Sequence, residues 1–441
     1  MKRVLIISYY WPPSGGSGVQ RWVKFSKYLP SEGWQPVIYT PENPELTAID
    51  KSMDNDIPPE AEVIKRRIVE PYGIYRKLTG AGKNADNGVK QQEVNPISGG
   101  KKSFMQKVSL FLRANIFVPD PRFLWIRPSV RFLKKYLKEN PVDLIVSSGP
   151  PHSMHLIARK LAKETSLPWI ADFRDPWTRL FYMKYLPQTS RTLKRQKRME
   201  LDVLNDASAI VAVTDGVQAE FRAMTATPVE CITNGYDEDD FRQLVEPDGY
   251  FNLTHTGLLA SNGNPEVLWK VLGEMCRQDE EFKNMMRLRL VGKVDKEVME
   301  SIVSEGIEEN VRNLGYQSHQ VATKEQINAS VLLLPLRIGE ELKTIIPGKM
   351  FEYLAASHPI LGIGQTDGEM AKIINSTKAG VVFDWNDYES VKHYMNSCWN
   401  RFKEGSLHSD AENITKYSRR ELTARMARLM DSLIKTEKTN E

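Results

Sequence analysis

Short apolar runs that alternate with helical patterns constrain the fold of this 441-residue chain more than any other feature of its sequence. Continuous runs of this kind are typical of parallel strands buried on both faces, and the helices between them supply the crossovers. The sequence therefore predicts an α/β fold with two Rossmann-like parallel sheets. The predicted strands are RVLIIS, PVIYT, EVIKRR, DLIVSS, PWIADF, SAIVAV, FNLTHTG, RLRLVG, SVLLLPL, PILGIG and AGVVFD.

The length of the chain and one break in its pattern predict two domains. A chain of 441 residues exceeds what a single core usually supports. The succession of strands stops at NGYDEDDFRQLVEPDGYF, residues 234–251, where acidic residues, glycine and proline cluster before a new strand. We therefore expect one domain over residues 1–240 and a second over residues 241–415.

Charge and cysteine content exclude several classes of protein. The 60 basic and 56 acidic residues give a net charge of +4, too small an imbalance to indicate a nucleic-acid partner. Three cysteines without CxxC spacing indicate neither a disulfide framework nor a zinc site. No apolar run approaches the ~20 residues of a membrane span, and the opening run is shorter than a signal sequence. We expect a cytoplasmic protein.

A glycine-rich loop follows the first predicted strand, in the stretch YYWPPSGGSGVQRW at residues 9–22. The two prolines end the strand, while Gly15, Gly16 and Gly18 permit positive φ and close approach of the backbone. From Val19 the pattern becomes helical, so the glycines lie at a helix N-terminus, whose free N–H groups suit an anion. The spacing matches neither the NAD nor the ATP phosphate loop. The alternative is a tight turn without a ligand. One helical face is expected to hold Val19, Trp22, Val23, Ser26 and Leu29.

A second candidate site lies in LPLRIGEELKTIIPGKMFEYLAASHPILGIG, residues 334–364. Pro347 suits a first helical turn, and Gly348 and Lys349 then offer free N–H groups and a cation, which together can hold a diphosphate. Glu352 lies three residues after Lys349, where its carboxylate could accept hydrogen bonds from a cis-diol such as a ribose. The alternative is a surface ion pair between the two side chains.

Residues 147–177 bring further polar side chains to the ends of predicted strands in the first domain. His152, Asp172, Arg174 and Asp175 lie at or near C-terminal strand ends, where ligands of open α/β sheets gather. Asp172 or Asp175 could orient or deprotonate an acceptor hydroxyl. The alternatives are a packed helical turn for His152 and a capping or turn role for Asp175.

A polar segment and a basic segment follow each other within the first domain. Residues 76–103 are rich in glycine, asparagine and lysine and are expected to form a mobile loop. Residues 104–138 interleave aromatic and aliphatic residues with eight lysines or arginines, Lys107, Lys134 and Lys135 among them. Such a stretch can lie in a lipid headgroup layer. The alternative is a helical hairpin that covers the sheet with a solvated basic face.

Read together, these motifs resemble those of the retaining glycosyltransferases with the GT-B architecture, called family 4 or group 1. The resemblance covers the chain except an insertion at about residues 70–135. It implies two Rossmann-like domains that face an interdomain cleft, with a last helix, residues 416–441, that crosses back to the first domain. The matching motifs are PPSGGSGVQR, NGYDEDDF, TGLL, the Gly315–Tyr316 pair and PGKMFEYLAASHPIL, the most specific of them.

The resemblance implies a role for each candidate residue. Glu352 would bind the donor ribose, Lys349 and the backbone of residues 348–351 the diphosphate, and Tyr316 would mark the nucleobase pocket. From the opposite wall of the cleft, Gly15 and Gly16 would approach the donor. The remaining donor-side residues are Gly257, Arg337, Thr344 and Gly348.

Two departures from the family pattern stand out. The family carries a glutamate at the position of Thr344, and Glu340 and Glu341 are out of register with it. Many relatives also carry an arginine and a lysine after the TG turn, where this chain reads LLASNGNPEV. The positive charge that holds the leaving diphosphate is therefore expected from Lys349, and next from Arg337.

The expected function is a metal-independent, retaining glycosyltransferase of surface-polysaccharide or capsule biosynthesis. Its substrate would be a nucleotide sugar, UDP- or GDP-linked, with no cofactor or metal, since the DEDD of residues 237–240 is interpreted as a solvated acidic turn. The acceptor would be a polyprenyl-linked glycan at the inner face of an anionic membrane. The alternatives are a nucleotide-sugar epimerase of the same fold and a scaffold with a decayed donor site, which Thr344 favours.

Overall fold

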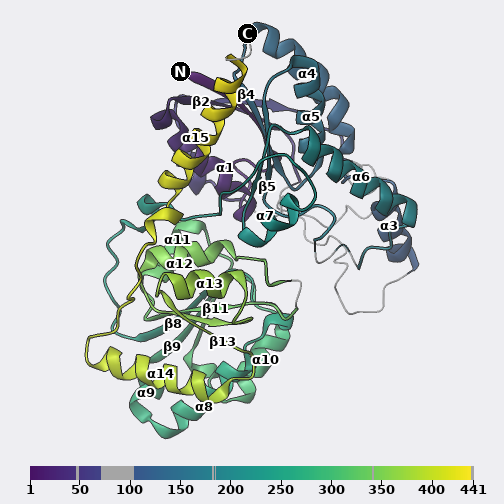
Figure 1. The fold of residues 1–441 in the computed structure, drawn as a ribbon. Helices are drawn as coiled ribbons and strands as arrows, with labels where there is room; N and C mark the ends of the chain where they lie inside the picture. Colours follow the sequence, from purple (N-terminus) through teal and green to yellow (C-terminus); the bar gives the residue numbers. More distant parts are fainter. Residues whose placement is uncertain (46–48, 71–103, 181–182, 184, 340–341, 439–441) are drawn as a thin grey trace. The chain divides into compact units, whose positions relative to one another are not determined.

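The computed structural model describes residues 1–45, 49–70, 104–180, 183, 185–339 and 342–438. The chain forms two compact units (Figure 1). The first comprises Met1–Thr233 with Leu422–Glu441, and the second comprises Asn234–Glu421. The structure divides the chain after residues 233 and 421, whereas the sequence predicted divisions after residues 240 and 415. The segment 76–103, predicted as a mobile loop, lies outside the described residues, as do Glu340 and Glu341.

The sheet of the first unit has seven strands in the order β3-β2-β1-β4-β5-β6-β7, all parallel. The strand order reverses between β1 and β4, and ligands of such sheets bind beyond the carboxyl ends of the strands at this switch point. The strands are β1 (Lys2–Ile7), β2 (Trp34–Pro41), β3 (Glu62–Arg66), β4 (Leu144–Gly149), β5 (Trp169–Phe173), β6 (Ala209–Ala212) and β7 (Val229–Cys231).

The sheet of the second unit repeats this topology with six parallel strands in the order β10-β9-β8-β11-β12-β13. Its switch point lies between β8 and β11. The two parallel sheets confirm the predicted fold class. The apolar runs did not include β7 or β10, because β7 has only 3 residues and β10 (VRNLG) carries arginine and asparagine within a largely exposed strand. The strands are β8 (Phe251–Thr256), β9 (Met286–Val291), β10 (Val311–Gly315), β11 (Val331–Pro335), β12 (Ile360–Ile363) and β13 (Gly380–Phe383).

Helices cover both faces of the first sheet. Because successive side chains of a strand point to opposite faces, Val4 and Ile6 pack beneath α1 and α15 while Leu5 and Ile7 pack beneath α4 and α5. The predicted buried face of α1 is confirmed in full, from Val19 to Leu29. The helices of this unit are α1 (Ser17–Tyr28), α3 (Phe104–Asn115), α4 (Ile126–Glu139), α5 (Ser153–Thr165), α6 (Ser190–Asp206) and α7 (Asp215–Arg222), with α15 (Arg419–Lys438) joining from Leu422 onward.

The second sheet is likewise covered on both faces. Val331 and Leu333 pack with α8 and α14, and Leu332 and Leu334 pack with α12 and α13. The helices are α8 (Glu266–Gln278), α9 (Glu280–Met285), α10 (Lys296–Ser304), α11 (His319–Ile327), α12 (Gly348–Ala356), α13 (Glu369–Ser376) and α14 (Tyr388–Lys403). Short 3-10 helices over both units are η1 (Leu29–Glu32), η2 (Ser52–Asp56), η3 (Phe123–Trp125), η5 (Glu238–Phe241), η6 (Ser261–Gly263), η7 (Glu308–Asn310) and η9 (Thr415–Tyr417).

The basic segment 104–138 divides into two helices with different surroundings. In α4 the apolar side chains lie in the core and Lys134 forms an ion pair with Glu164 at 2.8 Å. For α4 the structure therefore shows the alternative interpretation, a helix that covers the sheet with a solvated basic face. The other helix, α3, keeps apolar side chains in solvent. None of the described helices is long and apolar enough to cross a membrane.

A buried ion pair joins α1 to β5 in the first unit. Arg21 donates to the Oδ1 atom of Asp172 at 2.8 Å, and both side chains are almost fully removed from solvent. Arg21 also donates to the carbonyl oxygens of Thr233 at 2.8 Å and Ile232 at 2.9 Å. One guanidinium thus holds the first helix, the end of β5 and the last residues before the division of the units.

Replacing Arg21 by Met is expected to lower the free energy of unfolding of the first unit by about 3–5 kcal/mol, because Asp172 stays buried without its partner. Urea denaturation measures the loss. The exposed Arg131→Met is the matched control, with an expected effect within about 0.5 kcal/mol. Because the pKa of Asp172 is lowered, the stabilisation is present above the unfolded value of about 3.9 and is lost as pH falls through the folded one. Equal stability of the two variants would contradict the role given to Arg21.

Candidate functional site

The glycine-rich loop of the first unit leaves the N-terminus of α1 open. Gly16 is exposed with φ of 97°, and none of the side chains that the structure describes caps the helix that begins after it. Gly15 is buried beside it. A Cβ atom on Gly18 would lie 3.0 Å from the Arg174 Nη1 atom. Gly16 is thus required for its backbone conformation and Gly18 for close approach, which leaves the first N–H groups of α1 at the switch point.

His152 follows β4, on the other side of the same switch point. Its ring stacks on Trp177 with a centroid distance of 4.5 Å and an interplanar angle of 4°. The side chain is 6% exposed, and neither ring nitrogen has a hydrogen-bond partner in the described part of the chain. Burial, with His155 and Arg174 nearby, holds the pKa of His152 well below its usual value. His152 is therefore a packed, neutral imidazole with two unused polar atoms.

The Asp172 carboxylate is fully occupied within the fold. Besides Arg21, Trp22 Nε1 donates to its Oδ2 atom at 2.8 Å and Ser148 Oγ donates at 3.0 Å. Burial alone would raise the pKa of Asp172, but Arg21 and these hydrogen bonds lower it below its usual value. Asp172 thus holds α1, β4 and β5 together and has no exposure through which an acceptor could reach it.

Asp175 differs from Asp172 in every one of these respects. It is half-buried, and none of the described residues forms an ion pair or hydrogen bond with its carboxylate. It therefore caps no helix. Burial raises the pKa of Asp175 to about 6, against the opposing charge of Arg174. Of the two predicted carboxylates, Asp175 is the one able to exchange a proton near neutral pH.

Three glycines form the carboxyl edge of the second sheet. Gly257, Gly292 and Gly315 directly follow or end β8, β9 and β10, and their φ values are 94°, 137° and 64°. A Cβ atom on Gly292 would lie 2.3 Å from the Gly257 carbonyl oxygen, and one on Gly257 would lie 2.9 Å from Lys349 Nζ. Gly292 therefore has no room for a side chain against Gly257, and a side chain on Gly257 would meet the Lys349 ammonium.

Lys349 is held over this edge by a buried histidine. Its Nζ atom lies 3.3 Å from His255 Nε2, while His255 Nδ1 lies 3.0 Å from the Leu333 carbonyl oxygen. Because a carbonyl only accepts, we assign the proton to Nδ1, so that Nε2 accepts from the lysine. Burial lowers the pKa of Lys349 to about 8, with Glu352 opposing and Arg337 adding to the shift.

The Glu352 carboxylate on α12 is positioned by α11. His319 Nε2 lies 3.1 Å from its Oε1 atom, and Gln326 Nε2 donates to its Oε2 atom at 2.9 Å. Gln326 Nε2 also reaches Thr256 Oγ1 at 3.1 Å, which connects the pair to the end of β8. These contacts orient the Glu352 carboxylate at the edge of the sheet.

The remaining predicted donor-side residues belong to the same edge of the second unit. Tyr316 is 61% exposed after β10, and Arg337 is half-buried after β11. Thr344 is half-buried in the turn before α12. Gly348 begins α12, and Pro347, the N-cap residue before it, provides no side-chain cap. The first N–H groups of α12 are thus available beside the Lys349 ammonium.

Sequence reasoning missed the residues that orient these groups. Arg21 and Trp22 hold Asp172, His255 holds Lys349, and His319 with Gln326 holds Glu352. Each lies far along the chain from its partner, with the nearest pair separated by 26 residues. Two of them carried a signal: Arg21 ends the motif PPSGGSGVQR, and His255 stands two residues before the glycine of the TG turn.

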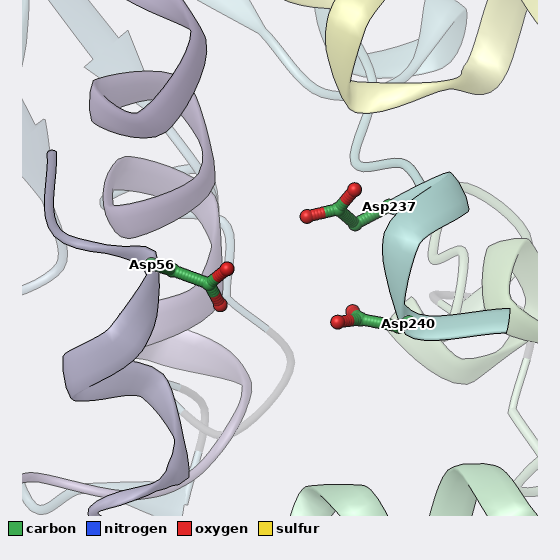
Figure 2. Close-up of side chains that lie close together, drawn as sticks. All are labelled: Asp56, Asp237 and Asp240. Carbon is green, nitrogen blue, oxygen red and sulfur yellow. The ribbon is translucent and has the colours of Figure 1, made fainter. Parts of the chain in front are cut away.

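The acidic turn at residues 237–240 forms η5 of the second unit. Asp237 caps it by accepting a hydrogen bond from Asp239 N at 3.1 Å. Figure 2 shows Asp237 and Asp240 on this turn; the third side chain drawn, Asp56, belongs to η2 of the first unit. Within either unit taken alone, the described residues bring together no three ligands of a metal site.

Part of the chain matches a known protein family. Residues 98–240 match the family model of Glycosyltransferase Family 4. The match spans about a third of the chain and falls almost entirely in the first unit, over β4, β5 and the loops that carry His152 and Asp175. No curated protein sequence matches the chain.

Solved structures share the fold along almost the whole chain. A glycosyltransferase from Rickettsia africae is 12% identical with a TM-score of 0.61, covering 98% of this chain and 99% of its own. The sucrose-phosphate synthase of Thermosynechococcus elongatus is 13% identical with a TM-score of 0.58, covering 100% of both. A Listeria monocytogenes protein described as a UDP-N-acetylglucosamine 2-epimerase is 10% identical with a TM-score of 0.57, covering 99% and 98%. These likenesses show the GT-B fold.

Lys349 is expected to titrate with a pKa of about 8, because burial disfavours its ammonium form, whereas ordinary lysines titrate near about 10.4. Reductive methylation with isotope-labelled methyl groups, followed by NMR across pH, measures the value. The variant Lys349→Arg removes the signal and so assigns it. A Lys349 signal that titrates with the other lysines would contradict the burial of this ammonium.

Proposed function

We propose that this protein is a glycosyltransferase that moves a sugar from a nucleotide-diphosphate donor to a hydroxyl acceptor. The observation that carries the proposal is the Lys349 ammonium at the uncapped N-terminus of α12, above an edge of bare glycines. A helix N-terminus with a fixed cation binds a diphosphate and stabilises it as it leaves. The match of residues 98–240 to Glycosyltransferase Family 4 supports transfer as the reaction.

In this proposal the second unit binds the donor. Lys349 and the first N–H groups of α12 hold the diphosphate, with Arg337 as the second cation. Glu352, oriented by His319, accepts hydrogen bonds from the ribose hydroxyls. The exposed Tyr316 borders the nucleobase. Gly257 admits the phosphates close to the backbone. Thr344 offers an uncharged hydroxyl where the family has a carboxylate, so its hydrogen bond to the donor sugar is the weaker one.

The first unit binds the acceptor and supplies the proton acceptor. Asp175 takes the proton of the acceptor hydroxyl, since it is the unpaired carboxylate at the end of β5. His152, stacked on Trp177, supports this edge by packing, and the backbone at Gly15 and Gly16 approaches the donor. Asp172 holds α1, β4 and β5 together beside this site. We further propose a retaining, metal-independent reaction on a lipid-linked surface glycan at the cytoplasmic face of a membrane.

A panel of UDP-, GDP- and ADP-sugars tests the donor site. We expect the nucleotide sugars of one nucleobase to raise the melting temperature, because a ligand at 100 times its Kd stabilises the folded protein by about 2.7 kcal/mol. Both Lys349→Met and Glu352→Ala should abolish this shift, one by removing the diphosphate cation and the other by removing the ribose acceptor. The exposed Lys372→Met and Glu389→Ala are the matched controls and should keep it.

The products distinguish the proposal from its alternatives. Slow donor hydrolysis without acceptor supports transfer. Conversion of the donor sugar into its epimer, with the nucleotide still attached, would identify an epimerase. No stabilisation by any nucleotide sugar would favour the scaffold, while a shift that survives Glu352→Ala would overturn the ribose assignment.

The pH dependence of turnover tests Asp175. Because only the carboxylate accepts a proton, kcat for transfer or donor hydrolysis is expected to rise through a pKa of about 6. Asp175→Asn should lower kcat by about 100-fold or more and remove this limb of the profile. The exposed Asp54→Asn in the same unit is the control. An unchanged profile in Asp175→Asn would exclude Asp175 as the base.

A further inference from the structure

The helix α3 presents an apolar stripe to solvent. Val108, Phe111, Leu112 and Ile116 are 37%, 47%, 37% and 56% exposed. Phe111, Leu112 and Ile116 lie three, four and eight residues after Val108, which places them along one side of the helix, and Ile116 N continues the helical pattern by donating to Leu112 O at 2.9 Å. The opposite side is buried through Leu110 and Ala114. A helix that turns one apolar side inward and another outward has a surface left to cover.

The helix α6 carries a dense row of cations on its solvent side. Arg191, Lys194, Arg195, Lys197 and Arg198 are all exposed, and four of them follow the helical spacing i, i+3, i+4 and i+7. In the part of the chain that the structure describes, none of the five forms an ion pair. The exposed Leu193 and Leu201 lie among them at 37% and 38%.

The acidic residues of α6 do not neutralise this row. Glu200 is buried and accepts from Trp177 N at 3.1 Å, and Asp202 and Asp206 pair with Arg159 at 3.3 and 2.5 Å. The three carboxylates of α6 are therefore either buried, as in Glu200, or paired with Arg159, as in Asp202 and Asp206. The solvent side of α6 therefore keeps its full positive charge.

Two hydrogen bonds fix the apolar helix to the basic one (Figure 1). Asn115, the last residue of α3, donates through Nδ2 to the Pro187 carbonyl oxygen at 2.8 Å. Its Oδ1 atom accepts from Thr189 N, also at 2.8 Å. Thr189 is the N-cap of α6, because its side chain accepts from Thr192 N. The end of the apolar stripe is thus joined to the start of the cationic row.

We propose that α3 and α6 together form a docking surface for an anionic lipid bilayer. Stable attachment to a membrane surface needs two signals, apolar insertion and electrostatic attraction, and here α3 supplies the first and α6 the second. Charge complementarity selects the occupant, since five uncompensated cations beside exposed apolar side chains fit anionic headgroups over an acyl layer. The helix α4 also exposes cations, but its apolar side chains are buried, so it offers one signal only. This surface does not depend on the reaction proposed above.

Cosedimentation of the full chain with phosphatidylcholine vesicles, with and without phosphatidylglycerol, tests the proposal. We expect binding to the anionic vesicles only, weakened by added salt because the attraction is screened. The variant R191Q/K194Q/R195Q/K197Q/R198Q should bind at least about 100-fold more weakly. The matched control K270Q/R277Q/K283Q/K293Q/K296Q removes the same charge from exposed positions of the second unit and should bind as the parent chain does.

A second variant separates the apolar signal from charge. F111Q/I116Q keeps every cation and is expected to lose at least about tenfold in binding, with an unchanged melting temperature because both side chains are exposed. Equal binding of neutral and anionic vesicles, or an equal loss in the second-unit control, would overturn the proposal. So would binding of a labelled oligonucleotide through α6 without binding of vesicles, which would make nucleic acid the partner.

Discussion

The buried ion pair of Arg21 and Asp172 is the contact on which the functional edge of the first unit depends. It joins the helix after β1 to the end of β5, and the carbonyls of Ile232 and Thr233 share the same guanidinium. Removing two charges from water is costly, and only the additional hydrogen bonds compensate for it. The contact therefore holds a single arrangement of these segments, in which Asp175 stands just beyond β5.

The second unit orients its polar groups with histidines instead of an arginine. His255, fixed by a carbonyl of β11, orients Lys349, and His319 orients Glu352. In both units a side chain distant in sequence holds a polar group at the carboxyl edge of a parallel sheet. The strands end and the helices begin at this edge, so helix N-termini and loop side chains meet there by construction.

Local patterns predicted much of this arrangement. The apolar runs identified most strands, and the helical spacing after Val19 identified the buried face of α1, because burial on both faces and helical periodicity leave a direct record in the sequence. The same patterns could not distinguish Asp172 from Asp175. The two lie three residues apart at one strand end, and only the folded structure brings Arg21 into an ion pair with Asp172. Likewise α3 and α4 were predicted as one basic segment, although α4 buries its apolar side chains while α3 leaves Val108, Phe111 and Leu112 in solvent.

By itself, the sequence determined the parallel α/β class, the two-domain organisation and the positions of the glycine-rich loop and of Lys349. These properties depend on residues near one another in the chain, through strand and helix periodicity and the backbone freedom of glycine. The tertiary structure decided which carboxylate is free, what holds Lys349 and Glu352, and that α3 stands beside α6. Those outcomes depend on pairs distant in sequence, whose burial and charge exist only once the sheets have assembled.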